Sequence, residues 1–156
     1  MITTFKLFED IKTNFSLGRI RGMHRDRILD IINDKDNEKL WDLTTFVDWP
    51  KFIKDRDEKI NFDELRGKVE EKFGDLTDFS RIYHLIYDKL KEYFEVVWLE
   101  DDSKLHVSDD SYTDLISSIV GNGKDFIKRT LNDDDVVLNM VKNNEYRENF
   151  GYIFND

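Results

Sequence analysis

The segment that most constrains the fold runs from Asp78 to Phe94, where apolar residues recur at intervals of three and four without glycine or proline. Such spacing gathers the apolar side chains on one side of an α-helix. The positions that follow the pattern are Phe79, Ile82, Tyr83, Ile86, Leu90, Tyr93 and Phe94. This segment therefore predicts the best-defined helix of the chain.

Shorter helical patterns lie on both sides, because one proline and seven glycines leave most of the 156 residues uninterrupted. Asp48 followed by Trp49 and Pro50 is a typical helix start. Asn61 and Asn132 are interpreted as further N-caps, and the stretch 14–22, with two glycines and a serine, as a loop. The predicted helices cover about 23–33, 37–46, 49–58, 62–73, 78–94, 110–120, 124–131 and 133–141.

One region favours β-structure. Residues 96–99 and 104–107 flank the turn-prone Asp101-Asp102-Ser103, as in a β-hairpin, and a frayed helix end followed by a loop is the alternative. No internal repeat and no Gly/Ser-rich linker divides the chain. The prediction is a single domain over residues 1–156, mainly α: a compact multi-helix bundle with one small β-hairpin near 96–107.

The absence of cysteine excludes disulfides, Cys-ligated zinc, iron–sulfur clusters and thiol catalysis. Residues 1–10 lack the continuous apolar stretch of a secretory signal. No window approaches the roughly 18 apolar residues of a membrane-spanning helix. We therefore expect a cytoplasmic protein that makes no membrane contact.

The known metal and cofactor motifs do not fit this sequence. The histidines are His24, His84 and His106. No two of them lie three or four residues apart, so they form no helical metal pair. The acidic run that begins at Asp34 has Lys39 and Thr45 where a calcium loop needs glycine and glutamate. Asp125 follows Gly121-Asn122-Gly123-Lys124 where a phosphate-binding loop needs a hydroxyl. We expect no metal ion and no cofactor.

Residues 108–131 combine an acidic and aromatic helix start, Ser108 to Tyr112, with a glycine-containing turn at 121–123 before a second short helix. In these features the segment resembles a helical domain family of bacterial proteins that has no established activity. The resemblance covers less than a sixth of the chain. It implies helices here and carries no functional assignment.

Charge is distributed unevenly along the chain. The net charge is -10, yet residues 1–27 carry +3, so the other 129 residues carry -13. An acidic body repels nucleic acid and attracts basic surfaces. The first hypothesis is therefore an acidic interaction protein that binds a basic surface of a protein partner, as inhibitors, immunity proteins and nucleic-acid mimics do. Its candidate contact residues are Asp34, Asp36, Glu38, Glu70, Glu71, Glu100, Asp101, Asp102, Asp133, Asp134 and Asp135.

Two alternatives stay open. The basic segment 19–27 is a candidate for nucleic-acid or phosphate contact through Arg19, Arg21, Arg25 and Arg27, because basic loops beside helix starts bind anions. Pairing of these arginines with the protein's own excess acids is the competing interpretation. An enzyme of a type that no motif reveals is the second alternative, and the sequence names no catalytic residue for it.

Overall fold

The longest helix, α6 (Thr77–Glu100), lies at the centre of the fold and packs against α2, α3 and α7. The computed structural model describes residues 14–100 and 107–154. All seven apolar positions predicted for the segment 78–94 are buried, and Val96 and Val97 extend the buried side toward the helix end. The prediction of a mainly helical chain is confirmed.

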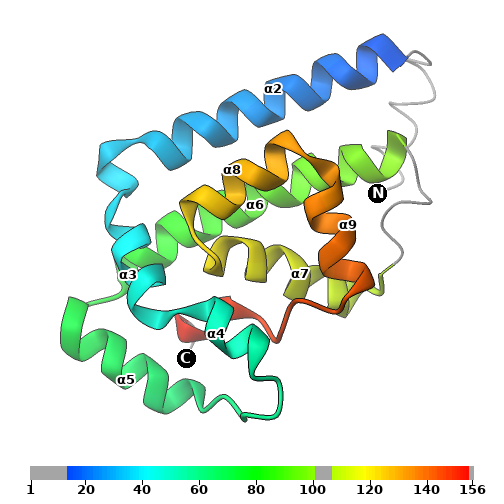
Figure 1. Ribbon diagram of the computed structural model, residues 1–156. Coiled ribbons are helices and arrows are strands. Elements are labelled where there is room, and N and C mark those ends of the chain that lie inside the picture. The colour runs from blue at the N-terminus through cyan, green and yellow to red at the C-terminus, as the bar shows by residue number, and fades with distance from the viewer. Residues whose placement is uncertain (1–13, 101–106, 155–156) are drawn as a thin grey trace.

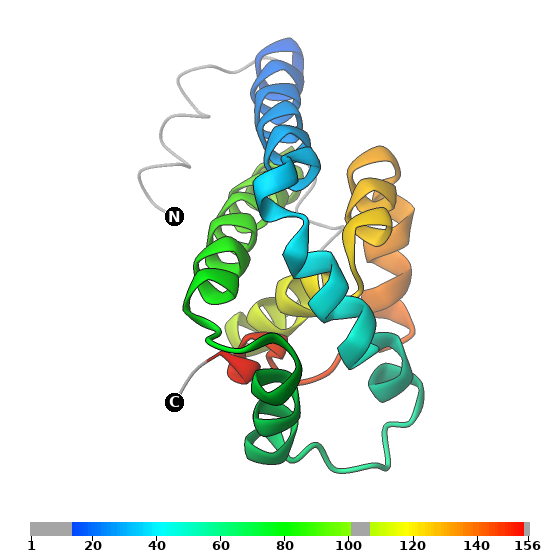
Figure 2. The same ribbon diagram turned by 90° about the vertical axis from the view of Figure 1, so that its left-hand side faces the viewer.

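The other elements surround α6. They are α2 (Asn14–Asn33), η1 (Lys35–Asn37), α3 (Lys39–Val47), α4 (Trp49–Lys54), α5 (Phe62–Phe73), α7 (Asp109–Gly121), α8 (Lys124–Asn132), α9 (Asp134–Lys142) and η2 (Phe150–Ile153). Figure 1 shows α2 crossing above α6 and α8, with α7 beneath them. Figure 2 shows α2 set between α6 on one side and α8 and α9 on the other. The buried side chains of all these layers form one hydrophobic core.

Helix boundaries follow the local signals in the sequence. The Asn61 side chain accepts a hydrogen bond from the Glu64 backbone N–H at 3.1 Å, so it caps α5 as predicted. Gly74 ends α5 with a positive φ of 80°. The predicted cap of the last helix is wrong by one residue, because Asn132 closes α8 and Asp133 caps α9. Asp133 has an extended backbone and its side chain accepts the N–H of Asp135 at 3.0 Å.

The predicted β-hairpin near 96–107 is wrong. Residues 96–99 continue α6, and the described residues contain no β-strand. Val96 and Val97 are buried against the core, so packing outweighs the weak preference of β-branched residues for strands. The turn at 101–103 and most of the second segment, 104–107, lie outside the described residues.

The predicted loop at 14–22 is also wrong, because these residues form the first turns of α2. The two glycines there are tolerated inside the helix. A Cβ at Gly18 or Gly22 would meet no atom within 4 Å, so no neighbour requires glycine at either position. Contacts of Arg21 with α6 and α9, described below, support this half of the helix.

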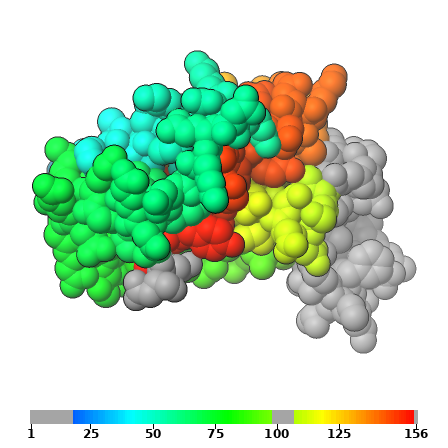
Figure 3. Space-filling view, turned by 90° about the horizontal axis from the view of Figure 1, so that it is seen from below, coloured from blue at the N-terminus to red at the C-terminus, as the bar shows by residue number. Residues whose placement is uncertain are grey.

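The C-terminal segment docks through a buried polar network. Ser117 of α7 accepts hydrogen bonds from the Tyr83 hydroxyl at 2.8 Å and from the Gly151 N–H at 3.1 Å. It donates to Asn149 Oδ1 at 2.6 Å. Burial raises the pKa of Tyr83 well above its ordinary value, which keeps the hydroxyl protonated as a donor. Figure 3 shows this segment, in red, filling the seam between α5 and α7.

Within the described residues, no helix combines the length and the apolar character needed to cross a membrane.

Candidate functional site

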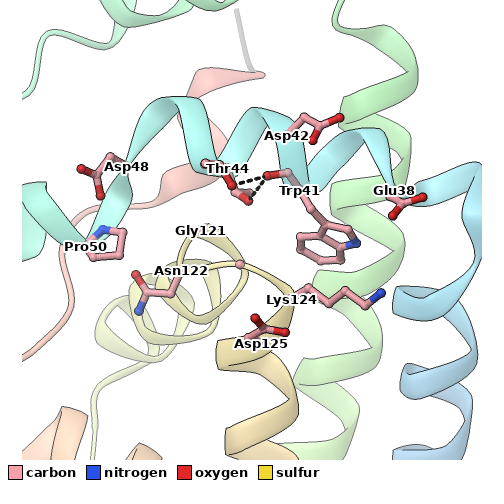
Figure 4. A pocket seen from close by; sticks show the side chains of 12 residues that line it. Glu38, Trp41, Asp42, Thr44, Asp48, Pro50, Gly121, Asn122, Lys124 and Asp125 are labelled. Carbon is pink, nitrogen blue, oxygen red and sulfur yellow. Dashed lines mark hydrogen bonds between the residues drawn. The ribbon is translucent and has the colours of Figure 1, made fainter.

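A surface groove lies between the α3–α4 segment and the turn that joins α7 to α8. Its volume is about 420 Å³. The residues that line it are Glu38, Trp41, Asp42, Thr44, Thr45, Asp48, Pro50, Gly121, Asn122, Gly123, Lys124 and Asp125. Figure 4 shows Asn122, Lys124 and Asp125 below the α3–α4 segment, with the Trp41 indole between α3 and Lys124. We call this hollow the acidic groove.

Two special backbone positions shape the acidic groove. Asp48, between α3 and α4, has φ 56° and ψ 59°, the left-handed conformation that lets one helix follow directly on another. Gly123, between α7 and α8, has φ 97°, which glycine adopts at little cost. Both sharp turns bring a helix start to the groove. The carboxylates of Asp48 and Asp125 therefore stand on opposite edges of it.

A close helix contact holds the α7–α8 turn in place. A Cβ on Gly121, the last residue of α7, would lie 2.7 Å from Phe150 Cδ1 and 2.9 Å from Trp49 Cδ1. Glycine therefore lets the end of α7 approach the start of α4. The indole N–H of Trp49 donates to Ser118 Oγ at 3.1 Å and fixes the same contact.

The acidic groove carries net negative charge. It has four carboxylates, from Glu38, Asp42, Asp48 and Asp125, against one ammonium, from Lys124. All four acidic residues are exposed. Asp48 makes no capping hydrogen bond with its side chain, although it precedes α4. The groove is therefore suited to cationic groups that enter from solvent.

The hydroxyl groups of the acidic groove bond within α3. The hydroxyls of Thr44 and Thr45 both donate to the Trp41 carbonyl, at 3.0 and 2.8 Å, and so serve the helix. Across residues 14–100 and 107–154, no group of three or more acidic or histidine side chains is arranged to hold a metal ion.

The structure separates most of the predicted acidic contact residues from one another. Asp34 and Asp133 act as caps, accepting the N–H groups of Asp36 and Asp135 at 2.9 and 3.0 Å. Glu70 and Glu71 are exposed on α5, and Glu100 ends α6. Asp101 and Asp102 lie outside the described residues. Of the predicted acids that the structure describes, Glu38 lines the acidic groove.

The four predicted phosphate-contact arginines do not form one common surface. Arg21 forms an ion pair with Asp134 and donates from Nε to the Tyr93 hydroxyl at 3.0 Å. Burial alone would lower the pKa of the Arg21 guanidinium, but these bonds raise it above its ordinary value. Arg25 also points to Tyr93, at 3.5 Å, whereas Arg19 and Arg27 are exposed.

A second acidic feature lies on α7, away from the groove. Burial, together with the nearby negative charges of Glu148 and Asp110, raises the pKa of Asp114 to about 6. Arg147 pairs with Glu148 through Nε at 3.3 Å, while its Nη1 donates to the carbonyl oxygens of residues 52, 55 and 58. The fold therefore disfavours the charged form of Asp114.

Sequence reasoning missed three of the four groove acids. Asp48 was interpreted as a helix cap and Asp125 as part of a failed phosphate loop, while Asp42 lay on the polar side of a predicted helix. The left-handed conformation of Asp48 and the turn at Gly123 bring these segments together. The one available signal was the sequence Gly121-Asn122-Gly123, which marks a sharp turn between helices.

Comparison with protein-family models, curated proteins and solved structures gave no match for this chain. The resemblance of residues 108–131 to a bacterial helical family therefore stays a prediction.

Proposed function

We propose that this protein binds a basic surface of a protein partner, and that the acidic groove receives the partner's cationic side chains. The observation that carries the proposal is the convergence of Glu38, Asp42, Asp48 and Asp125 on one hollow with Lys124 as the opposing charge. Such a protein acts as an inhibitor, an immunity protein or a nucleic-acid mimic, occupying a basic site on its partner.

The charge of the whole chain supports the same proposal. Residues 28–156 carry -13, which attracts a basic partner over a distance and speeds the encounter. The groove then provides short-range contacts in a concave surface, where solvent screens charge less than on a flat one. Long-range attraction thus comes from the charge of the whole acidic body, and local recognition from the four groove acids within it.

Titration with an oligo-arginine peptide tests this proposal. We expect binding that weakens as salt rises from about 20 mM to about 150 mM, because exposed charges are screened over that range. The double variant D48N/D125N should weaken binding about fivefold to tenfold, the effect of two partly exposed charge pairs. Asparagine tolerates the left-handed conformation at position 48, so the turn is preserved.

The variant E70Q/E71Q is the matched control, since it removes the same charge from exposed positions on α5. It should change the affinity by less than about twofold. Equal weakening by both double variants would show that net charge alone attracts the peptide, and the groove would not be the binding site.

Nucleic-acid contact through Arg19, Arg21, Arg25 and Arg27 has weaker support, because Arg21 is bound to Asp134 and Tyr93 within the protein. No observation in the described residues favours a particular reaction, so we propose no enzymatic activity.

A further inference from the structure

The middle of α2, residues 18–27, lies on the body without entering the core. We call it the basic strap. None of its side chains is buried, and Met23 is 64% exposed. Among residues 18–33 of α2, the buried residues are Ile28 and Ile32. The core therefore holds α2 from Ile28 onward, and other forces hold the strap.

Polar contacts attach the basic strap to α6 and α9. Arg21, with a side chain 16% exposed, pairs with Asp134 and donates to the Tyr93 hydroxyl. His24 Nδ1 lies 3.6 Å from Glu92 Oε2. The buried Nε of Arg25 makes no hydrogen bond within the part of the chain that the structure describes, although Arg25 Nη2 reaches the Tyr93 hydroxyl. A buried donor without an acceptor favours an open strap, in which water can hydrate it.

The basic strap is also a weak helix. Gly18 and Gly22 lie inside it, and a Cβ at either position would meet no atom within 4 Å. Alanine would fit at both positions, and each replacement would raise the equilibrium constant for helix formation by about fivefold. Neither packing nor a positive φ explains these glycines. Their effect is to make the helix easier to open.

We infer that the basic strap opens while the core stays folded, and that a basic segment of the partner takes its place over Tyr93, Glu92 and Asp134. This inference rests on the proposed function. It adds a second contact surface for the partner and makes the basic strap the element that controls access to it. The strap carries four arginines against Asp26, a net +3, so it has the charge of the proposed partner. The strap competes with that partner because it belongs to the same chain as the surface it covers, which gives it a high effective concentration there.

Amide hydrogen exchange of the full chain tests the opening. We expect amides in 18–27 to exchange much faster than those in 28–33, and faster still at high salt. G18A/G22A should slow exchange in the strap by about 20-fold. R21Q should speed it by about tenfold, since it removes charged hydrogen bonds. R27Q is the matched control, because it removes the same charge at an exposed position, and it should change exchange by less than about twofold.

Oligo-arginine titration of the same variants tests the competition. The peptide should speed exchange in residues 18–27, bind more tightly to R21Q than to R27Q, and bind less tightly to G18A/G22A than to the unchanged protein. Far-UV circular dichroism of each variant checks that the helical fold is kept.

Two results would overturn the inference. If residues 18–27 exchange as slowly as residues 28–33, the strap does not open separately. If the strap opens but G18A/G22A binds the peptide as tightly as the unchanged protein, the strap does not compete with a basic partner. In the second case the groove proposal still stands if D48N/D125N weakens peptide binding, so the two ideas fail separately.

Discussion

Replacement of Gly121 by alanine tests the close contact between α7, α4 and the C-terminal segment. The added Cβ would lie 2.7 Å from Phe150 Cδ1, 2.9 Å from Phe150 Cγ and 2.9 Å from Trp49 Cδ1. Phe150 and Trp49 are both fully buried, so neither ring can turn toward solvent. Inserting a methyl group into such a packed site costs about 3 kcal/mol.

Part of this cost is offset, because alanine favours the helix over glycine by about 1 kcal/mol. The free energy of unfolding should therefore fall by about 2 kcal/mol, which lowers the midpoint of thermal unfolding by about 4 to 8 °C for a chain of this size. Urea titration and thermal unfolding followed by circular dichroism measure both quantities.

Gly67, exposed inside α5, provides the matched control, since a Cβ there would meet no atom within 4 Å. G67A should raise the free energy of unfolding by about 0.5 to 1 kcal/mol. A double-mutant cycle tests the cause: F150A should cost at least about 1 kcal/mol less when Gly121 is already alanine. The reasoning would be refuted if G121A proved as stable as the unchanged protein, since the rings could then move aside.

Three further variants test other contacts. Because the folded-state pKa of Asp114 is about 6 and the unfolded value is lower, its contribution to stability is lost as pH rises through about 6. D114N should flatten that pH dependence in urea titrations and stabilise the fold at pH 7 by about 1 kcal/mol, the shift being discounted for solvent screening. S117A should lower the free energy of unfolding by about 1 to 2 kcal/mol, whereas a loss below about 0.3 kcal/mol would show that the Tyr83 and Gly151 bonds re-form elsewhere. R147M should cost about 2 kcal/mol in the same assay, and R147K should restore less than half of it, because one ammonium cannot match the planar guanidinium that donates to three carbonyls.

The helices were predictable because the spacing of apolar residues in the sequence shows which side of each helix is buried. All seven apolar positions of the segment 78–94 are buried, and Asn61 and Gly74 mark the ends of α5. The same local reasoning failed at residues 96–99, where two adjacent valines favour a strand by propensity. They are helical because, as part of α6, both valines are buried, and this burial outweighs their preference for strands.

The sequence by itself determined that the chain is acidic, lacks cysteine and forms amphipathic helices, since these properties depend on composition and on neighbours a few residues away. Only the tertiary structure decided which charges meet. Arg21 and Asp134 stand 113 residues apart in the chain, and Glu38 and Asp125 line one groove between the turns at Asp48 and Gly123. Charged residues lie on the solvent-facing sides of the helices, and their spacing in the sequence does not indicate which acid pairs with which base. Because the packing of the buried sides sets how the helices lie against one another, it also decides these pairs.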